Sequence, residues 1–322
     1  MIMSFVLNCR LEIGSYLFTS VNNIKVESSR KKLTDTAVIT LPNKYASRFL
    51  SNEIKSGDKV TIWINYVNFP TEKVFEGYVL SINPGRPITI NCEDEMYQLK
   101  RKHLKGIAWE STTLKNVLEY MVPEIKTNCP QITLAPFYIK KDTNVAAALD
   151  KLKDTYGIDV YFRNKVLFAG LAYTDTDTLN KPVVVYDLDK NVLPNPPLTY
   201  RVADQIRMKI KAISILPNNK KLETEVGDGD GSVTTLHFYN VTSIEELKRQ
   251  AKVKLEQMKY DGFAGNIVTM GLPHIEHGYT LKIIDNRDDG SRSGYYFADS
   301  VVTTFGIGGY RKEVYIGRRA KA

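Results

Sequence analysis

The sequence has few residues that could form disulfides or metal sites. Its 322 residues include only three cysteines and four histidines. Cys9, Cys92 and Cys129 are far apart and odd in number, which excludes a disulfide framework or a four-cysteine zinc site and fits a reducing compartment. Because so few of the preferred ligands are present, neither a metal nor another cofactor is expected.

Long apolar runs are also missing. No stretch approaches the roughly 18–20 apolar residues that a membrane-spanning helix needs, so we expect no membrane insertion. The N-terminal stretch MIMSFVLNCRLEIG lacks a basic head, and Asn8 and Arg10 interrupt its apolar run. No secretory signal is therefore predicted.

Positive charge is only in modest excess. The 44 Lys+Arg and 36 Asp+Glu residues give a formal net charge of +8, but the basic residues are spread along the chain, which disfavours a nucleic-acid groove. The short basic clusters are expected on a solvated surface; they are Arg30-Lys31-Lys32, Lys100-Arg101-Lys102 and Arg318-Arg319.

The composition is that of a globular chain with many tyrosines. Hydrophobic residues make up 43% and charged residues 25%, which excludes a disordered or fibrous protein. The 19 tyrosines and 12 phenylalanines favour half-exposed strands and broad polar interfaces over a helical bundle. The length predicts two domains, or three to four small ones.

Residues 1–105 are predicted to form a small β-barrel or sandwich. Apolar residues alternate with polar ones, as half-buried strands require, and Gly57-Asp58 and Asn83-Pro84-Gly85 mark turns. Several short strands with turns between them indicate this class of fold. The predicted strands run from Phe5 to Ile13, Thr36 to Leu41, Val60 to Tyr66, Phe75 to Ile82 and Ile88 to Cys92.

Residues 106–190 are predicted to form a small α/β domain. A helical stripe from Leu114 to Met121 follows Ser111-Thr112 and ends before Pro123. A second helix follows Asp142-Thr143, and Gly157 is placed to cap its end in the left-handed conformation. Its predicted buried face comprises Val145, Ala148, Leu149, Leu152 and Tyr156, and a hairpin of Ile158–Phe162 and Lys165–Ala169 should follow, turning at Arg163-Asn164.

Residues 191–322 are predicted to form a second β-barrel domain. The proline-rich stretch from Asn191 to Pro197 is a linker. Ser243 and Glu246 form a capping box that opens an amphipathic helix over residues 243–259. Its predicted buried stripe is Ile244, Leu247, Ala251, Leu255 and Met258, and the predicted strands are Tyr200–Ile215, Tyr279–Ile284, Tyr295–Val302 and Gly309–Ile316.

Two segments indicate an internal repeat. Ser56–Ile62 and His277–Ile283 each place a turn glycine before an alternating strand. Gly77-Tyr78-Val79 and Gly294-Tyr295-Tyr296 are the glycine-aromatic strands that follow them. Two related barrels around the α/β domain are one interpretation, and the general similarity of β-hairpins is the other.

No motif predicts catalysis, so no catalytic, cofactor-binding or metal-binding residue is assigned. His274 and His277 have the spacing of a weak metal pair, but we expect a turn histidine and an exposed histidine. Glu93-Asp94-Glu95 could supply the paired carboxylates of a glycosidase, but a solvated cluster is expected.

Two glycine-rich segments are likewise expected to bind nothing. Gly306 to Gly309 leads into a strand instead of a helix, so it lacks the N-terminus that would cradle phosphate. The acidic loop from Gly227 to Gly231 lacks the glutamate that a calcium loop needs at its twelfth position.

The order of these segments resembles the late control D family, the baseplate hub proteins of phage tails and related contractile injection systems. In the first domain the similar strings are LTDTAVITL at 33–41, SGDKV at 56–60 and VFEGYV at 74–79. In the last quarter they are the helix 251–258, GLP at 271–273, HGYTL at 277–281, GYY at 294–296 and residues 301–310. The V-x-H string of the family corresponds to Val302-Thr303-Thr304 here and lacks its histidine, and no lysozyme-like segment is visible.

The resemblance implies a non-enzymatic structural protein. Such hubs form homotrimers in which two barrels per chain make a pseudo-sixfold ring, connecting the tail tube protein to the central spike protein. The implied location is the baseplate of a virion tail assembled in the host cytoplasm. The tape measure protein and other baseplate proteins are further implied neighbours, and DNA is implied only as passing cargo.

Two alternatives remain open at the level of sequence. A receptor- or glycan-binding tail module would use Trp63 or Trp109 as a stacking platform, although a core position is expected for both. A tail-associated cell-wall hydrolase would use Glu93. A single sheet with a deep acidic or histidine-lined cleft, and no second barrel, would contradict the hub interpretation.

Overall fold

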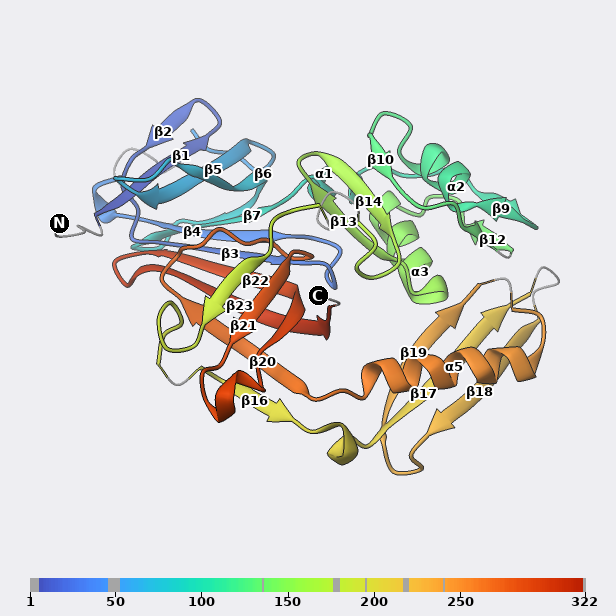
Figure 1. Cartoon of the computed structure of the whole chain (residues 1–322). Coiled ribbons are helices and arrows are strands. Elements are labelled where there is room, and N and C mark those ends of the chain that lie inside the picture. Colours follow the sequence, from blue (N-terminus) through green and yellow to red (C-terminus); the bar gives the residue numbers. More distant parts are fainter. Residues whose placement is uncertain are drawn as a thin grey trace.

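The computed structural model describes residues 6–45, 53–134, 136–175, 180–194, 196–216, 220–239 and 241–320. The described chain is mainly β, with three sequence regions that form a long sheet, a helix-containing middle unit and a small separate sheet (Figure 1). The predicted mainly β class with helices is confirmed.

The first region contributes seven strands, and all five predicted strands are among them. In β1, Cys9 and Leu11 are buried while Arg10 between them is exposed, which confirms the predicted alternation; the predicted start at Phe5 lies outside the described residues. The short strand β2 and the strand β3, with its alternating Ile24 and Val26, were not predicted. The strands are β1 Leu7–Ile13, β2 Tyr16–Phe18, β3 Asn23–Ser29, β4 Thr36–Leu41, β5 Lys59–Tyr66, β6 Glu72–Asn83 and β7 Ile88–Glu93.

The middle region packs two helices against short strands around one apolar core. Both predicted helices form: Thr113 caps α2, Asn144 caps α3, and Gly157 ends α3 with φ of 63°. The predicted hairpin turns one residue later than expected, at Asn164 and Lys165, which both have positive φ. The elements are α1 Met96–Leu99, β8 Ile107–Trp109, β9 Thr112–Thr113, α2 Leu114–Met121, β10 Thr127–Asn128, β11 Thr133–Leu134, β12 Phe137–Ile139, α3 Val145–Tyr156, β13 Asp159–Arg163 and β14 Val166–Gly170.

The last region divides between the long sheet and a small sheet of β17, β18 and β19 that α5 covers (Figure 1). The stretch Tyr200–Ile215, expected as one strand, is two strands in different sheets, β16 and β17. Helix α5 begins at Ser243 as predicted, but Ile244 is 44% exposed and does not join the buried stripe. The elements are β15 Val184–Asp187, β16 Leu198–Arg201, β17 Met208–Ile215, β18 Lys221–Gly227, β19 Ser232–Phe238, α5 Ile244–Met258, β20 Gly262–Thr269, β21 Thr280–Ile284, β22 Gly294–Gly306 and β23 Gly309–Arg319.

The strands of the first and last regions form one continuous sheet. The described path runs β16-β20-β23-β22-β3-β4-β7-β6-β5-β1-β2. Off this path, β21 pairs with β22, and β15 pairs with β21. The pairing of β3 with β22 joins the regions, and Phe305 and Tyr310 enter the apolar core of the first region. Neither region closes on itself within the described residues, so the predicted two-barrel architecture is not confirmed.

The two regions nevertheless repeat one strand order. In the first the order is β1-β5-β6-β7-β4-β3, and in the last it is β15-β21-β22-β23-β20-β16. Each position is filled by the corresponding strand along the chain. The regions differ in that β1 is antiparallel to β5, whereas β15 is parallel to β21. We call these six-strand sets the N-terminal half and the C-terminal half.

Hydrogen bonds match the two halves residue by residue. Gly57 N donates to Val79 O at 2.8 Å, and Gly278 N donates to Ala298 O at 2.7 Å. Both glycines have positive φ, and each precedes an equivalent strand: Gly57 precedes β5, and Gly278 precedes β21. Each half also has a β-bulge at the same place, between Val79 and Ser81 in one and between Ala298 and Ser300 in the other. The predicted repeat of residues 56–62 in 277–283 therefore has a structural counterpart, whereas Gly77 corresponds to Tyr296, two residues beyond the predicted Gly294.

Candidate functional site

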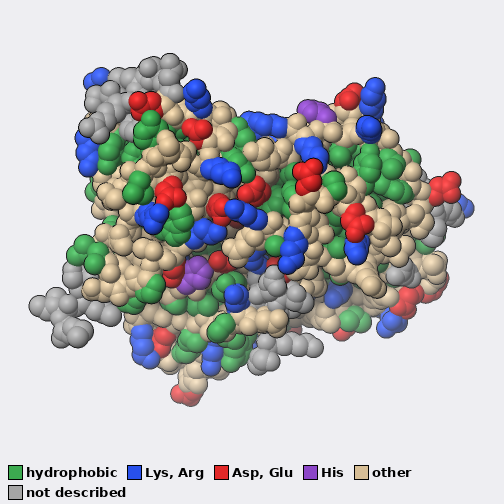
Figure 2. Space-filling model, turned by 90° about the horizontal axis from the view of Figure 1, so that it is seen from above, with side chains coloured by type: hydrophobic (Ala, Val, Ile, Leu, Met, Phe, Trp, Pro, Cys, Tyr) green, Lys and Arg blue, Asp and Glu red, His purple; other side chains and the backbone are tan. Residues whose placement is uncertain are grey.

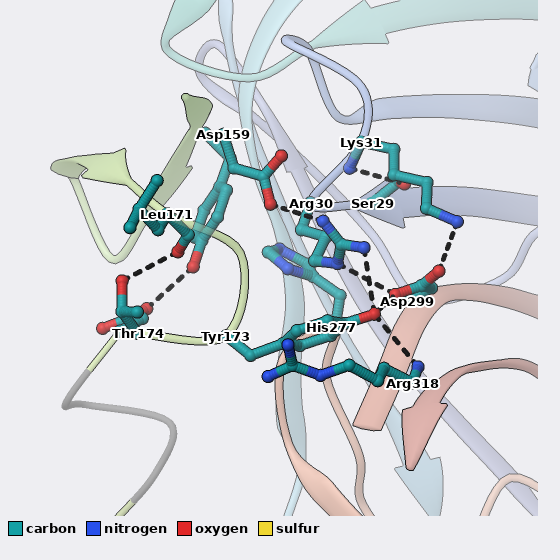
Figure 3. Close-up of polar contacts among 12 residues, drawn as sticks. Ser29, Arg30, Lys31, Asp159, Leu171, Tyr173, Thr174, His277, Asp299 and Arg318 are labelled. Atoms are coloured by element: carbon teal, nitrogen blue, oxygen red, sulfur yellow. Dashed lines mark hydrogen bonds and ion pairs between the residues drawn. The ribbon is translucent and has the colours of Figure 1, made fainter. Parts of the chain in front are cut away.

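The middle unit meets both halves of the long sheet at a buried ionic junction (Figure 3). Arg30 follows β3, Asp159 opens β13, Asp299 lies in β22, and Tyr173 follows β14. Arg30 is at the centre, with a side chain only 11% exposed. We call these four residues, with Lys31, the Arg30 junction.

The guanidinium of Arg30 uses each of its nitrogens. Nε donates to Asp299 Oδ1 at 2.9 Å, Nη1 donates to Asp159 Oδ2 at 2.5 Å, and Nη2 donates to the Tyr173 hydroxyl at 2.9 Å. The Tyr173 hydroxyl donates to Asp299, and Lys31 Nζ pairs with the second Asp299 oxygen. Residues far apart in the sequence are thus held by one side chain.

Burial and charge compete in this junction. Burial alone would lower the pKa of Arg30, but Tyr173 and the carboxylates of Asp299 and Asp159 outweigh it and raise that pKa. Burial also opposes ionisation of Asp299, yet Arg30 and Lys31 hold the pKa of this carboxyl below its ordinary value. For Asp159 burial prevails, and its pKa is raised despite Arg30. Removing these charges from water costs free energy during folding. Once the cluster is formed, loss of one member strongly destabilises the folded protein, because it leaves a buried charge without a partner.

A second polar cluster surrounds Arg163, at the end of β13. Its Nη1 donates to Asp175 Oδ2 at 2.6 Å, and its Nη2 donates to the carbonyl of His277 at 2.5 Å. The ring of Tyr161 lies edge-on to that of His277, with centroids 4.6 Å apart. His277 is 2% exposed, and burial together with Arg163 lowers its pKa to about 3. The ring is therefore neutral at physiological pH, and the expectation of an exposed histidine is wrong for His277.

His274 lies between two glutamates. Its Nδ1 is 2.7 Å from Glu72 Oε2 and its Nε2 is 3.2 Å from Glu276 Oε1. The hydrogen bonds with Glu276 and Glu72 raise the pKa of His274 to about 9. Burial would raise the pKa of Glu276, but His274 and Arg163 lower it to about 2. His274 is thus a half-buried imidazolium in an ion network and offers no lone pair to a metal.

A pocket of about 130 Å³ opens beside these clusters and is lined by acids, bases and both histidines. Asp35 and Asp94 lie on its wall, and burial raises the pKa of both carboxyls. Asp94 accepts hydrogen bonds from the backbone N–H groups of Asp35 and Met96, at 3.0 and 2.9 Å. Asp35 accepts from the Ser28 hydroxyl at 2.6 Å. These carboxylates hold β4, the turn before it and the start of α1 in place.

Most charged side chains of the pocket pair with one another, whereas the buried Lys312 Nζ has no hydrogen-bond partner among the described residues and lies 3.6 Å from Glu72 Oε2. Among the described residues, no group of three or more histidine, cysteine, aspartate or glutamate side chains could hold a metal ion. The thiols of Cys9 and Cys92 are buried, which raises the pKa of each to about 12 and leaves both protonated at neutral pH.

The acidic segment Glu93-Asp94-Glu95 is not the solvated cluster that was expected. Glu93 is 9% and Asp94 5% exposed. Glu93 ends β7, where it pairs with Thr36 of β4, and Asp94 lies between the turn before β4 and the start of α1. Lys100 Nζ pairs with Glu93 Oε1 at 2.8 Å. The acids of the 227–231 turn are also paired, Asp228 with Lys259 and Asp230 with Arg207.

Both tryptophans are half-buried, which differs from the core position expected of them. Trp63 packs against the Arg10 guanidinium, 5.2 Å from the ring centroid. Trp109 stacks on Phe137 with centroids 6.4 Å apart and meets Tyr120 edge-on at 5.5 Å. Gly306 and Gly309 end paired strands at the β22–β23 turn, as expected.

Most residues of the basic clusters are exposed, but Lys100 and Lys102 are half-buried. Figure 2 shows lysine and arginine side chains interspersed with aspartate and glutamate over the face it presents. Lys31, Lys32, Arg101, Arg318 and Arg319 are exposed as expected, whereas Arg30 is buried. The solvated-surface prediction is wrong for Arg30 because three acceptors from other elements surround it.

Sequence reasoning missed the Arg30 junction and the Arg163 cluster altogether. Their members are separated by long stretches of chain, so no local pattern connects them. One signal was available: Asp299 interrupts the apolar strand sequence YYFADSVV, and a charged residue there requires a partner.

No helix among the described residues has the length and apolar character needed to cross a bilayer. No known sequence family and no curated protein matches the chain.

Solved structures do match it. A tail protein from Neisseria meningitidis MC58 has a TM-score of 0.69 at 13% identity, covering 98% of this chain and 97% of that one. A 43 kDa tail protein of prophage MuSo2 from Shewanella oneidensis has a TM-score of 0.64 at 15% identity, with 97% and 98% covered. The E. coli protein c3393, a type VI secretion system component, has a TM-score of 0.58 at 8% identity, with 97% and 77% covered. The chain is therefore similar to phage tail and secretion-system proteins in fold, over almost its whole length, as the sequence resemblance predicted.

Proposed function

We propose that this chain, built on the fold of phage tail proteins, is a non-enzymatic baseplate hub that forms a homotrimer between the tail tube and the central spike. The observation that carries the proposal is the fold similarity to tail proteins along almost the full length of both chains. A fold kept from end to end favours a shared mode of assembly over a shared local site.

The internal repeat supports the trimer. Two halves with one strand order and one bulge position give each chain two similar building blocks. Three chains would then present six similar blocks, which is the geometric requirement for matching a hexameric tube to a trimeric spike. We assign residues 1–105 and 191–322 to the two tube-like domains and 106–190 to the middle domain, except that β15, Val184–Asp187, belongs to the second tube-like domain. Barrel closure is completed in the assembly.

The proposed partners are the tail tube protein and the central spike protein, with the tape measure protein and other baseplate proteins as neighbours. The proposed location is the baseplate of a virion tail that assembles in the host cytoplasm. The excess of basic residues would favour contact with an acidic tube rim and would tolerate DNA passing through the ring.

Oligomer mass tests the proposal. Native mass spectrometry of the purified chain, alone and with the spike and tube proteins encoded beside it, should give a species of three copies that binds both proteins. A chain that stays monomeric in every mixture, or that binds neither protein, would contradict the hub assignment.

A further inference from the structure

The two halves of the chain are already joined by one strand pairing. The second part of β22 runs antiparallel to β3, so that Ser300 is opposite Ser29 and Val302 is opposite Glu27. In the repeat, β6 corresponds to β22 and β16 corresponds to β3. The pairing that joins the halves therefore has a potential counterpart that uses β6 and β16.

The counterpart strands have the free edges that such a pairing needs. Strand β5 pairs with β6 only as far as Tyr78, so Ser81 to Asn83 are unpaired on that side within the described residues. Strand β16 is the last strand of the described sheet and pairs only with β20. Ser81, Asn83, Thr199 and Arg201 are all exposed.

The hydrogen-bonding register fixes which residues would meet. The matched bulges place Ser81 at the position of Ser300. The ladders from β7 through β4 to β3, and from β23 through β20 to β16, place Arg201 at the position of Ser29. The expected opposite pairs are Ser81 with Arg201, Ile82 with Tyr200, and Asn83 with Thr199.

Next to the expected pairs, each edge carries one exposed apolar residue, Leu80 and Val202. In the same register, Leu80 takes the position of Asp299, and Val202 takes the position of Arg30. The buried ion pair that joins the halves within the chain thus corresponds to two apolar side chains. Both are exposed in the single chain, Leu80 by 39% and Val202 by 40%, and contact between them would remove apolar surface from water.

We propose that copies of this chain join head to tail by antiparallel pairing of the free edge of β6 in one copy with β16 of the next, with Leu80 packed on Val202. This inference rests on the proposed trimeric hub and names its interface. The occupant is a second copy because each chain carries both edges in the register already used inside it. Such a head-to-tail contact generates a ring when the rotation closes.

The new ladder is shorter than the one inside the chain. Pro84 takes the position of Thr303 and has no N–H to donate, so pairing ends at Asn83. We therefore expect the β6–β16 pairing between chains to be weaker than the β3–β22 pairing within the chain.

A charge swap tests the proposal. Leu80→Asp alone and Val202→Arg alone should each raise the dissociation constant of the trimer at least tenfold, measured by mass photometry on the full chain with its spike protein present. The double variant Leu80→Asp/Val202→Arg recreates between chains the pair that Asp299 and Arg30 form within the chain, and it should restore the trimer. Val233→Asp, at a 59% exposed residue of β19, is the matched control and should leave the trimer intact.

The outcomes separate this proposal from the hub assignment. If the wild-type chain forms trimers and both single variants do as well, the interface is wrong while the hub assignment stands. If the double variant does not recover the trimer, Leu80 does not face Val202 and the proposal is overturned. If the wild-type chain forms no trimer in any mixture, both fail. Thermal unfolding of each variant monitored by circular dichroism confirms that the subunit remains folded.

The register has its own test. A chain with Asn83→Cys and Thr199→Cys should give covalently linked multimers on mild oxidation, because these positions are expected to be opposite each other. A chain with Asn83→Cys and Arg201→Cys is two residues out of register and should give far fewer. The reverse result would overturn the assigned register.

Discussion

Replacement of Arg30 by methionine is expected to lower the free energy of unfolding by about 3–5 kcal/mol, the cost of leaving buried carboxylates without their partner. Arg30 holds Asp159 of the middle unit and Asp299 of the C-terminal half at the same time. Among the described residues, its loss leaves Asp159 without an ion pair and Asp299 with Lys31 as its one ion-pair partner. Urea unfolding monitored by circular dichroism measures the change.

Two controls define this result. Arg249→Met removes an arginine that is 67% exposed and paired with Glu246 on α5, and it should leave the free energy of unfolding close to that of the wild type. Arg30→Met combined with Asp159→Asn and Asp299→Asn should recover part of the loss, because the unpaired charges are then gone. An Arg30→Met protein as stable as the wild type would show that the junction is not ionic.

His277→Gln is expected to flatten the loss of stability between pH 6.5 and pH 4.5. Burial holds the pKa of His277 at about 3 in the folded chain, below its ordinary value of 6.5. Below pH 6.5 the unfolded chain therefore binds a proton that the folded chain does not. Stability falls as the pH falls, with a slope that approaches about 1.4 kcal/mol per pH unit, or roughly 2 kcal/mol over this window.

Neighbouring groups do not reverse this sign. The raised pKa of His274 gives stability that is complete below pH 6.5 and is lost as the pH rises through about 9. The lowered pKa of Glu276 gives stability that is lost only below about pH 4.5. The facing carboxyls Asp35 and Asp94 remain in both proteins and cancel in the comparison. Chemical unfolding of wild type and variant across the window measures the difference, and His103→Gln, at an exposed histidine, should keep the wild-type slope. Parallel curves for wild type and His277→Gln would contradict the assignment.

Local patterns were sufficient for the three longer helices, α2, α3 and α5, and for most long strands, but they did not predict the short helix α1. Alternation in β4 and β5, and the caps of α3 and α5, act between near neighbours in the sequence. The turn glycines Gly57 and Gly278 revealed the repeat because both halves need positive φ before the same strand. What failed was long-range: the pairing of β3 with β22, and the burial of Arg30 and His277, depend on which segments meet.

A single sheet and an acidic or histidine-lined cleft are the features that would speak against the hub interpretation, and both are present in part. The long sheet is continuous, and a pocket beside it is lined by His274, His277 and several acids. Both histidines and the acids Glu72, Glu276, Asp35 and Asp94, however, are bound to other side chains or to backbone N–H groups. The repeated strand order also restores the idea of two similar blocks per chain, with the blocks fused into one sheet.

Electron cryomicroscopy of the assembled chain, reconstructed without imposed symmetry, tests the central claim most directly. The hub account predicts three copies around one axis, with the N-terminal and C-terminal halves alternating at similar radii to give six equivalent positions. A ring of another copy number, or halves at clearly different radii, would contradict it.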